Sequence, residues 1–204
     1  MTTKSRPKKH PRAGATMTGA DMIAQVLADE GVETVFGYSG GAILPTYDAI
    51  FRYNAEHSRG GREAIQFVVP ANEQGAGFMA AGYARSTGKV GVFIVTSGPG
   101  ATNTVTPIRD CMADSVPVVL LCGQVPCSAI GTDAFQEAPV FNIMNACAKH
   151  VFLVKNPAEL EATARTAFWI ARSGRPGPVV IDLPKDVQTW SGTFAGEGLL
   201  ELRG

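Results

Sequence analysis

The segment Gly37-Tyr38-Ser39-Gly40-Gly41 has the residue types of a nucleophilic site. It matches the pattern GxSxG, in which a strained turn between a strand and a helix exposes a reactive serine. A serine hydrolase also needs an acid followed by a histidine, yet no histidine follows Asp182, and Asp133 precedes His150 by too few residues. The turn also follows the first predicted strand and not a central one. Serine hydrolase chemistry is therefore disfavoured.

A second glycine-rich segment, Ser97-Gly98-Pro99-Gly100-Ala101-Thr102-Asn103, opens a predicted helix as a nucleotide-binding turn would. The dinucleotide fingerprint needs a third glycine where this chain has Asn103, and Val118–Cys122 offers no acidic residue for a ribose. Gly82–Lys89 misses the phosphate-loop pattern, because the spacing differs and Val90 replaces the required hydroxyl residue. The remaining interpretation of this segment is a glycine-rich turn that lets the backbone approach a neighbour closely.

Glu73 is a carboxylate that could reach a ligand. It follows the apolar run Phe67–Val69 and stands at the start of the helix predicted over residues 72–86. A glutamate in a first helical turn usually complements the helix dipole, which is worth at most about 1 kcal/mol at a surface. The small residues of Glu73-Gln74-Gly75-Ala76-Gly77, however, leave room for a ligand beside the carboxyl group. Both interpretations stay open on the residues alone.

Apolar runs alternate with helical patterns along the chain. Strands are predicted over residues 33–36, 67–69, 90–95, 117–122 and 179–181, helices over 18–31, from 44 past 47, 72–86, 101–113 and 160–171, and a surface loop over 52–63. Continuous apolar strands such as Val118–Leu121 indicate burial on both faces. We therefore expect an α/β fold, a doubly wound parallel sheet of about six strands with helices on both faces. Its ligand site should lie at the carboxyl ends of the strands.

Length and charge limit the organisation and the partners. The 204 residues are 45% hydrophobic and suit one domain with one core. The first sixteen residues contain five basic and no acidic side chains, although the whole chain has 18 of each, so the remainder is mildly acidic. This argues against nucleic acid as a partner of the folded part. We predict a disordered basic tail over residues 1–16.

Other features exclude further classes of protein. No run of about eighteen apolar residues could cross a membrane, and no apolar signal-peptide core begins the chain. We expect a protein without a membrane partner, in the cytoplasm or in an organelle stroma or matrix. The four cysteines form no CxxC pair and the three histidines add no zinc-ligand spacing, so we expect buried free thiols and no metal ligands.

Seven segments in order resemble the catalytic large subunit of the acetolactate synthase (acetohydroxyacid synthase) family. They are Tyr38-Ser39-Gly40-Gly41-Ala42, Glu73-Gln74-Gly75-Ala76-Gly77, Gly82-Tyr83-Ala84-Arg85, Thr96-Ser97-Gly98-Pro99-Gly100-Ala101-Thr102-Asn103, Gly123-Gln124-Val125-Pro126, Gly131-Thr132-Asp133-Ala134-Phe135-Gln136-Glu137 and Gly174-Arg175-Pro176-Gly177-Pro178. The resemblance covers Met17 to Gln188. It implies the N-terminal domain that binds the pyrimidine ring of thiamine diphosphate, over residues 17–188, with residues 189–204 starting a linker to further domains.

The resemblance also implies roles for particular residues. The glutamate matching Glu73 hydrogen-bonds the pyrimidine nitrogen N1′, which makes the cofactor its own base. Tyr38, Pro99 and Asn103 would line the pyrimidine pocket. Catalytic positions near the reacting carbon would be Gly41 and Gln136. The remaining matches are Phe135 and Lys185, bordering the substrate channel, and Ala42 and Pro126, at the herbicide-binding entrance. For Lys185 the plain alternative is a solvated lysine after the last strand.

The implied reaction joins two pyruvates, or pyruvate and 2-oxobutanoate, with loss of CO2 in branched-chain amino-acid biosynthesis. The family resemblance places Mg2+ and FAD in further domains, so the 204 residues alone should be inactive and should need a second protomer or partner chain with the diphosphate-binding domain. A regulatory small subunit is a further possible partner. Two alternatives are a stand-alone pyrimidine-domain subunit of a split 2-oxo-acid decarboxylase and a non-catalytic relic domain.

Three positions depart from the family pattern. Ser39 and Asn72 stand where proline and histidine are usual, and Ala81 stands where glutamate is common. These departures bear on substrate preference more than on the cofactor.

Overall fold

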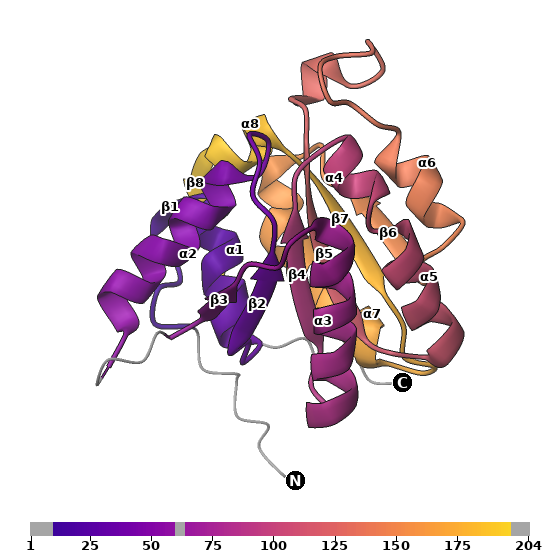
Figure 1. Cartoon of the computed structure of the whole chain (residues 1–204). Helices are drawn as coiled ribbons and strands as arrows, with labels where there is room; N and C mark the ends of the chain where they lie inside the picture. Colours follow the sequence, from indigo (N-terminus) through magenta and orange to yellow (C-terminus); the bar gives the residue numbers. More distant parts are fainter. Residues whose placement is uncertain (1–9, 60–63, 197–204) are drawn as a thin grey trace, which may run out of the picture.

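The computed structural model describes residues 10–59 and 64–196 and contains a six-stranded parallel sheet. The strand order is β3-β2-β4-β5-β7-β6 (Figure 1). The strands are β2 (Thr34–Gly37), β3 (Gln66–Val68), β4 (Gly91–Val95), β5 (Val118–Gln124), β6 (His150–Leu153) and β7 (Val179–Pro184). The predicted doubly wound parallel sheet is confirmed.

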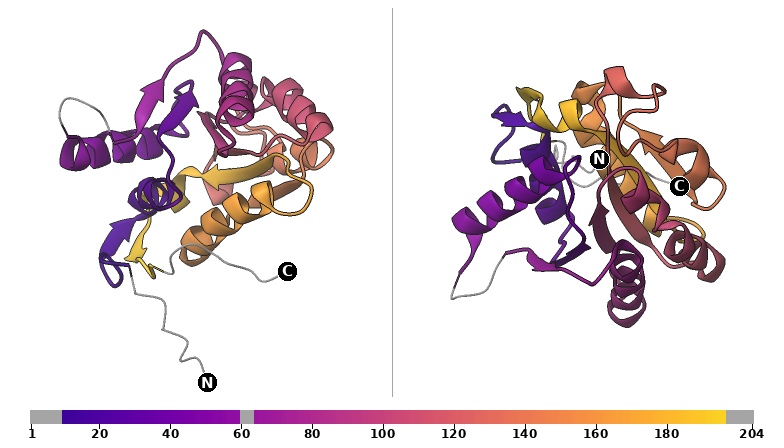
Figure 2. Two further views of the ribbon diagram at one scale, coloured as in Figure 1. Left: turned by 90° about the horizontal axis from the view of Figure 1, so that it is seen from below. Right: turned by 45° about the horizontal axis from the view of Figure 1, so that its top comes forward.

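Helices cover both faces of this sheet, as predicted (Figures 1 and 2). One layer consists of α1 (Gly19–Asp29), α2 (Leu44–His57) and α7 (Leu160–Arg172), and the other of α3 (Glu73–Thr87), α5 (Val105–Asp114) and α6 (Val140–Asn145). In β5, Val119 and Leu121 pack into the first core while Val118 and Leu120 pack into the second. Burial on both faces is the reason for the continuous apolar run.

Short elements lie at the carboxyl edge of the sheet, where the ligand site is expected. They are α4 (Pro99–Thr102), the 3-10 turn η1 (Cys127–Ala129) and α8 (Lys185–Thr189), while the 3-10 turn η2 (Pro157–Glu159) precedes α7. Two α-helix starts among the described residues carry side-chain caps. The Thr18 hydroxyl accepts from the Asp21 backbone N–H at 3.1 Å, and the Asn72 side chain accepts from the Gly75 N–H at 2.8 Å. The second cap fixes where α3, and with it Glu73, begins.

The loop predicted over residues 52–63 is wrong in its first half, because α2 continues to His57. Arg52 forms ion pairs with Asp48 and Asp21, and the buried side chain of Asn54 bonds to both the N–H and the C=O of Ile65. Asp48 lies one turn earlier on α2, while Asp21 and Ile65 lie elsewhere in the fold. Together these contacts stabilise a polar helix. Residues 60–63 lie outside the described residues.

The helix predicted over residues 101–113 is two helices, α4 and α5, with Asn103 and Thr104 between them. Pro107 has no N–H to donate to the Asn103 carbonyl, so one continuous helix would leave that carbonyl without its bond. At the break itself, the Thr104 hydroxyl donates a hydrogen bond to the Ala101 carbonyl at 2.6 Å. The break leaves Asn103 at the end of α4.

The folded part of the chain is wider than the boundaries drawn at residues 17 and 188. Strand β1 (Thr16–Thr18) pairs antiparallel with β8 (Ser191–Thr193), and Phe194 is fully buried. His10 lies 3.1 Å from Asp29 as an ion pair when protonated. The predicted tail and linker are therefore folded in these parts. Residues 1–9 and 197–204 lie outside the described residues.

All four cysteines are free thiols. Cys111 and Cys122 are buried as predicted, but Cys127 and Cys147 are partly exposed, which corrects the expectation for those two. Burial raises the pKa of the Cys111 thiol to about 12. Within residues 10–59 and 64–196, no helix is long and apolar enough to cross a membrane, and no group of three or more His, Cys, Asp or Glu side chains could hold a metal ion.

Candidate active site

The strand order reverses between β2 and β4, and a crevice is expected at the carboxyl ends of these two strands. From β2 the chain passes outward through α2 to β3, then returns through α3 to β4 on the other side of β2. Gly37 pairs with Ile94 at the last register position. Both glycine-rich segments therefore begin at this point, as expected from the sequence.

Glu73 lies at the start of α3 with only 9% of its surface exposed. The Asn103 side-chain amide donates to Glu73 Oε2 at 2.9 Å, a contact that the break between α4 and α5 makes possible. A Cβ atom added to Gly100 would lie 3.4 Å from Glu73 Oε1 and 2.7 Å from Thr96 Cγ2. Glycine at position 100 thus keeps space beside the second carboxylate oxygen.

Gln136 joins the site through its backbone. Gly98 has φ +56°, and a Cβ there would lie 2.4 Å from the Gln136 carbonyl oxygen, so the two segments are in direct contact. Gln136 itself has φ +55°, a left-handed conformation that costs a non-glycine residue roughly 1–3 kcal/mol. A strained residue packed on the glycine-rich turn is the kind of outlier found at binding sites.

Gly41 and Ala42 are positioned by a residue that sequence reasoning missed, Gln188. This fully buried amide donates to the Ala42 carbonyl at 2.7 Å and to the Leu183 carbonyl at 3.0 Å, and it accepts from the Thr46 hydroxyl at 2.9 Å. Gln188 therefore ties the turn after β2 to the end of β7. No local pattern marks it, because Ala42 is 146 residues away.

The segment carrying Pro126, Phe135 and Gln136 projects beyond the carboxyl edge of the sheet (Figure 1). Phe135 is 87% exposed. The Glu137 carboxylate accepts from the backbone N–H groups of Gly131 and Ala134 and holds the segment in a turn. These donors, the Gly131 N–H first, lower the pKa of Glu137. The exposed phenylalanine is thus presented on a hydrogen-bonded turn.

Lys185 and Pro126 follow the ends of neighbouring strands. Gln124 of β5 pairs with Pro184 of β7, and Lys185 and Pro126 are both exposed. The Cys127 N–H donates to the Asp186 carboxylate at 3.1 Å, which links the two segments. Tyr38 and Pro99, the remaining predicted pocket residues, are exposed at the carboxyl edge of the sheet. Among the described residues, no hydrogen bond or ion pair joins Lys185 to Glu73, so the structure brings the predicted residues to one edge without bringing all of them together.

Tyr47 is a second residue that sequence reasoning missed. It is 6% exposed, its ring packs on Phe67 with centroids 4.6 Å apart, and its hydroxyl has no hydrogen-bond partner among the described residues. Burial, and then the charge of Glu73, raise its pKa above the usual value. In the sequence Tyr47 reads only as a core residue of a helix.

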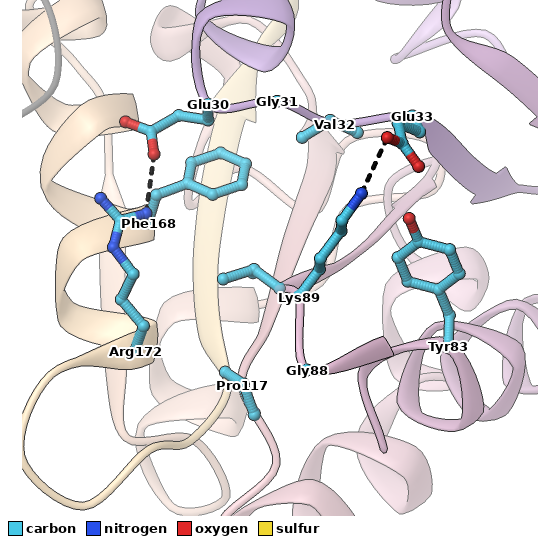
Figure 3. A pocket seen from close by; sticks show the side chains of 11 residues that line it. Glu30, Gly31, Val32, Glu33, Tyr83, Gly88, Lys89, Pro117, Phe168 and Arg172 are labelled. Atoms are coloured by element: carbon cyan, nitrogen blue, oxygen red, sulfur yellow. Dashed lines mark hydrogen bonds and ion pairs between the residues drawn. The ribbon is translucent and has the colours of Figure 1, made fainter. Parts of the chain in front are cut away.

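A cavity of about 440 Å3 lies at the opposite, amino edge of the sheet (Figure 3). Its two cations are paired, Arg172 with Glu30 at 2.7 Å and Lys89 with Glu33 at 2.8 Å. Phe168 and Pro117 line the space between these pairs. The two ion pairs therefore compensate the charges of the lysine and the arginine that line this cavity.

The chain is similar to known proteins over most of its length. The family described as thiamine pyrophosphate enzyme, N-terminal TPP binding domain, matches residues 17–145. The chain is 55% identical over 171 residues to the mitochondrial acetolactate synthase catalytic subunit of Saccharomyces cerevisiae, covering 84% of this chain and 24% of that protein. It is 51% identical over 176 residues to the acetolactate synthase isozyme 2 large subunit of Escherichia coli, covering 86% and 30%. The large subunit of Haemophilus influenzae is 52% identical over 170 residues, covering 83% and 28%. The chain thus spans between 23% and 30% of the length of the relatives it matches.

Proposed function

This chain belongs to the thiamine pyrophosphate enzymes, as their N-terminal TPP-binding domain, and we propose that it supplies the pyrimidine-binding half of an acetolactate synthase active site. The observation that carries the proposal is the buried Glu73 carboxylate, bonded by Asn103 on one oxygen and facing the space that Gly100 leaves beside the other. A carboxylate with one free oxygen next to an open space can share a proton with a ring nitrogen.

The residues fit the pyrimidine end of thiamine diphosphate. Glu73 would hold a proton at N1′, Asn103 would keep the carboxylate in place, and Tyr38 and Pro99 would contact the ring at the mouth of the crevice. Thiamine diphosphate, when bound, supplies the acidic ring carbon at which two 2-oxo acids are joined. The diphosphate, Mg2+ and FAD would be held by domains of a second protomer or a partner chain.

The substrate channel would be built from the projecting segment and its neighbours. Gln136 and Gly41 would lie close to the reacting carbon, and Lys185 would attract the carboxylate of pyruvate or 2-oxobutanoate. Three apolar positions, Phe135, Ala42 and Pro126, would form the entrance. A regulatory small subunit would act on this assembly. We place the reaction in the cytoplasm or in an organelle stroma or matrix, since the relatives include mitochondrial and bacterial enzymes.

The test combines this chain with a chain that bears the diphosphate-binding domain, thiamine diphosphate, Mg2+, FAD and pyruvate, and measures acetolactate. Glu73→Gln should abolish most of the product, while Glu56→Gln, which changes an exposed glutamate of α2, should leave it unchanged. Acetaldehyde and CO2 without acetolactate would instead indicate the split decarboxylase. Absence of any thiamine-dependent turnover with an intact partner would indicate a relic domain.

A further inference from the structure

Tyr47 presents an unpaired hydroxyl at the carboxyl end of β2. A Cβ atom on Gly37 would lie 2.6 Å from the phenol oxygen and 2.9 Å from the Ile94 carbonyl oxygen, so the hydroxyl sits where β2 and β4 end. The ring rests on Phe67 of β3, the strand that leads directly into the turn before Glu73. Three elements, α2, β2 and β3, therefore hold one phenol oxygen at the edge of the crevice.

A buried hydroxyl without a partner needs a physical explanation. Leaving such a group unsatisfied lowers stability, and the great majority of buried polar side chains have a partner in the protein or an ordered water. The space for the phenol exists only because residue 37 is glycine, since any side chain there would meet the oxygen. Phenylalanine would pack on Phe67 equally well without this cost. The hydroxyl is therefore better explained by an interaction in the site than by packing.

Glu73 begins α3 six residues after Phe67, the residue on which the Tyr47 ring rests. After burial, the charge of Glu73 is the second cause that raises the pKa of Tyr47. Three segments that include or follow β2, β3 and β4, residues 34–37, 66–72 and 96–103, contain no charged side chain, and Tyr38 contributes the one other ionisable group at the end of β2. The Glu73 carboxylate has one oxygen bonded by a neutral amide, Asn103, and can accept further hydrogen bonds. A phenol is a suitable second donor, because it is neutral and its position is fixed by packing.

We propose that Tyr47 is a positioning residue for Glu73: its O–H donates toward the carboxylate through one water and sets the orientation in which Glu73 meets the pyrimidine ring. This inference rests on the proposed function for the ring, but the contact between the two side chains belongs to this chain alone. Asn103 and Tyr47 then hold the carboxylate from the two sides, one from the break after α4 and one from α2.

The contact can be measured without turnover by a double-mutant cycle on the unfolding equilibrium of this chain. Tyr47→Phe removes one oxygen and keeps the ring on Phe67, and Glu73→Ala removes the acceptor. We expect the two changes to be coupled by about fivefold or more in the unfolding equilibrium constant. Tyr53→Phe is the matched control, because it makes the same change on the same helix away from Glu73. Effects that multiply within about twofold would overturn the proposal.

The assembled enzyme gives a second readout. Tyr47→Phe should lower kcat about tenfold, leave the KM for pyruvate unchanged within about twofold, and shift the pH profile of kcat, because a misoriented carboxylate exchanges its proton less readily. In a Glu73→Gln background the same change should have no further effect. If Glu73→Gln itself leaves turnover intact, the proposed function fails. If it abolishes turnover while Tyr47→Phe behaves as wild type in both experiments, only the role of Tyr47 fails.

Discussion

The two edges of the main sheet use buried glutamates differently. At the amino edge, the side chain of Glu30 is 1% exposed and is paired with the guanidinium of Arg172 at 2.7 Å. At the carboxyl edge, Glu73 is similarly buried, but its partner is the neutral amide of Asn103. A carboxylate whose charge a cation compensates is a structural partner, because removal of either group leaves the other charge buried and unpaired. A carboxylate bonded by a neutral amide can accept further hydrogen bonds from a ligand.

The comparison is tested most strongly by exchanging each glutamate for glutamine. Glu73→Gln should lower thiamine-dependent turnover by roughly 10²–10⁴-fold, the range for loss of a general acid–base group. Glu30→Gln should leave turnover of the remaining folded enzyme within about twofold and should lower thermal stability instead, since Arg172 loses its charged partner. The two readouts are initial rates and melting temperature. A loss of turnover of similar size in both variants would remove the distinction between the edges.

A second group of buried ion pairs fixes the C-terminal end of the described chain to the rest of the domain. Arg165 is fully buried and contacts Asp29 at 2.7 Å and Glu161 at 3.0 Å, and Glu161 accepts from the N–H groups of Ala195 and Gly196. Arg165→Ala should lower the unfolding free energy by about 3–5 kcal/mol, because two carboxylates lose their cation. Urea denaturation measures the effect. An exposed arginine, Arg109, provides the control as Arg109→Ala, and equal effects at the two positions would contradict the structural role.

Asp182 is a third buried carboxyl group, and it makes the stability of the fold depend on pH. It is 1% exposed, and the Gln124 amide that donates to it at 3.2 Å is neutral. Burial raises the pKa of Asp182 to about 7, although the Gln124 hydrogen bond opposes this. The folded chain therefore binds a proton more tightly than the unfolded chain, in which an aspartate titrates near about 3.9. The stability that this protonated form provides is present below about pH 4 and is lost as the pH rises to about 7.

Denaturation at a series of pH values tests whether stability falls as the pH rises. The contribution of Asp182 should reduce the unfolding free energy by up to about 1.4 kcal/mol for each pH unit between about pH 4 and about pH 7. Asp182→Asn, which cannot ionise, should flatten the profile in this interval. The same slope in the variant and the wild type would show that Asp182 is not the group responsible.

The sequence predicts the sheet and its ligand edge better than it predicts the contacts at that edge. Val118–Leu121 indicates a strand buried on both faces from its composition alone, and the structure confirms it. Strands β1 and β8 are three residues each and exist only through their pairing, which joins segments about 175 residues apart. No local pattern could reveal them.

The same physical reason separates the site residues. The sequence predicts Glu73 and the glycine-rich segments as candidates, because small residues after an apolar strand are a local signal, and the structure places them at the carboxyl edge of the sheet. Gln188 and Tyr47 were missed because their significance depends on neighbours from other elements, Ala42 for one and Gly37 for the other. The break that exposes Asn103 was also missed, although Pro107 is a local sign of it.

The smallest expected effect concerns the exposed half of the amino-edge cavity. Lys89 and Glu33 are both about half exposed and form an ion pair at 2.8 Å, so solvent screens their attraction. Lys89→Met, which keeps the length of the side chain, should change the unfolding free energy by less than about 1 kcal/mol, and the change should shrink further in 1 M salt. It should leave turnover of the assembled enzyme unaffected. A salt-independent loss of activity would mean that the amino edge communicates with Glu73 across the sheet, and the two edges could then no longer be treated as separate structural and chemical regions.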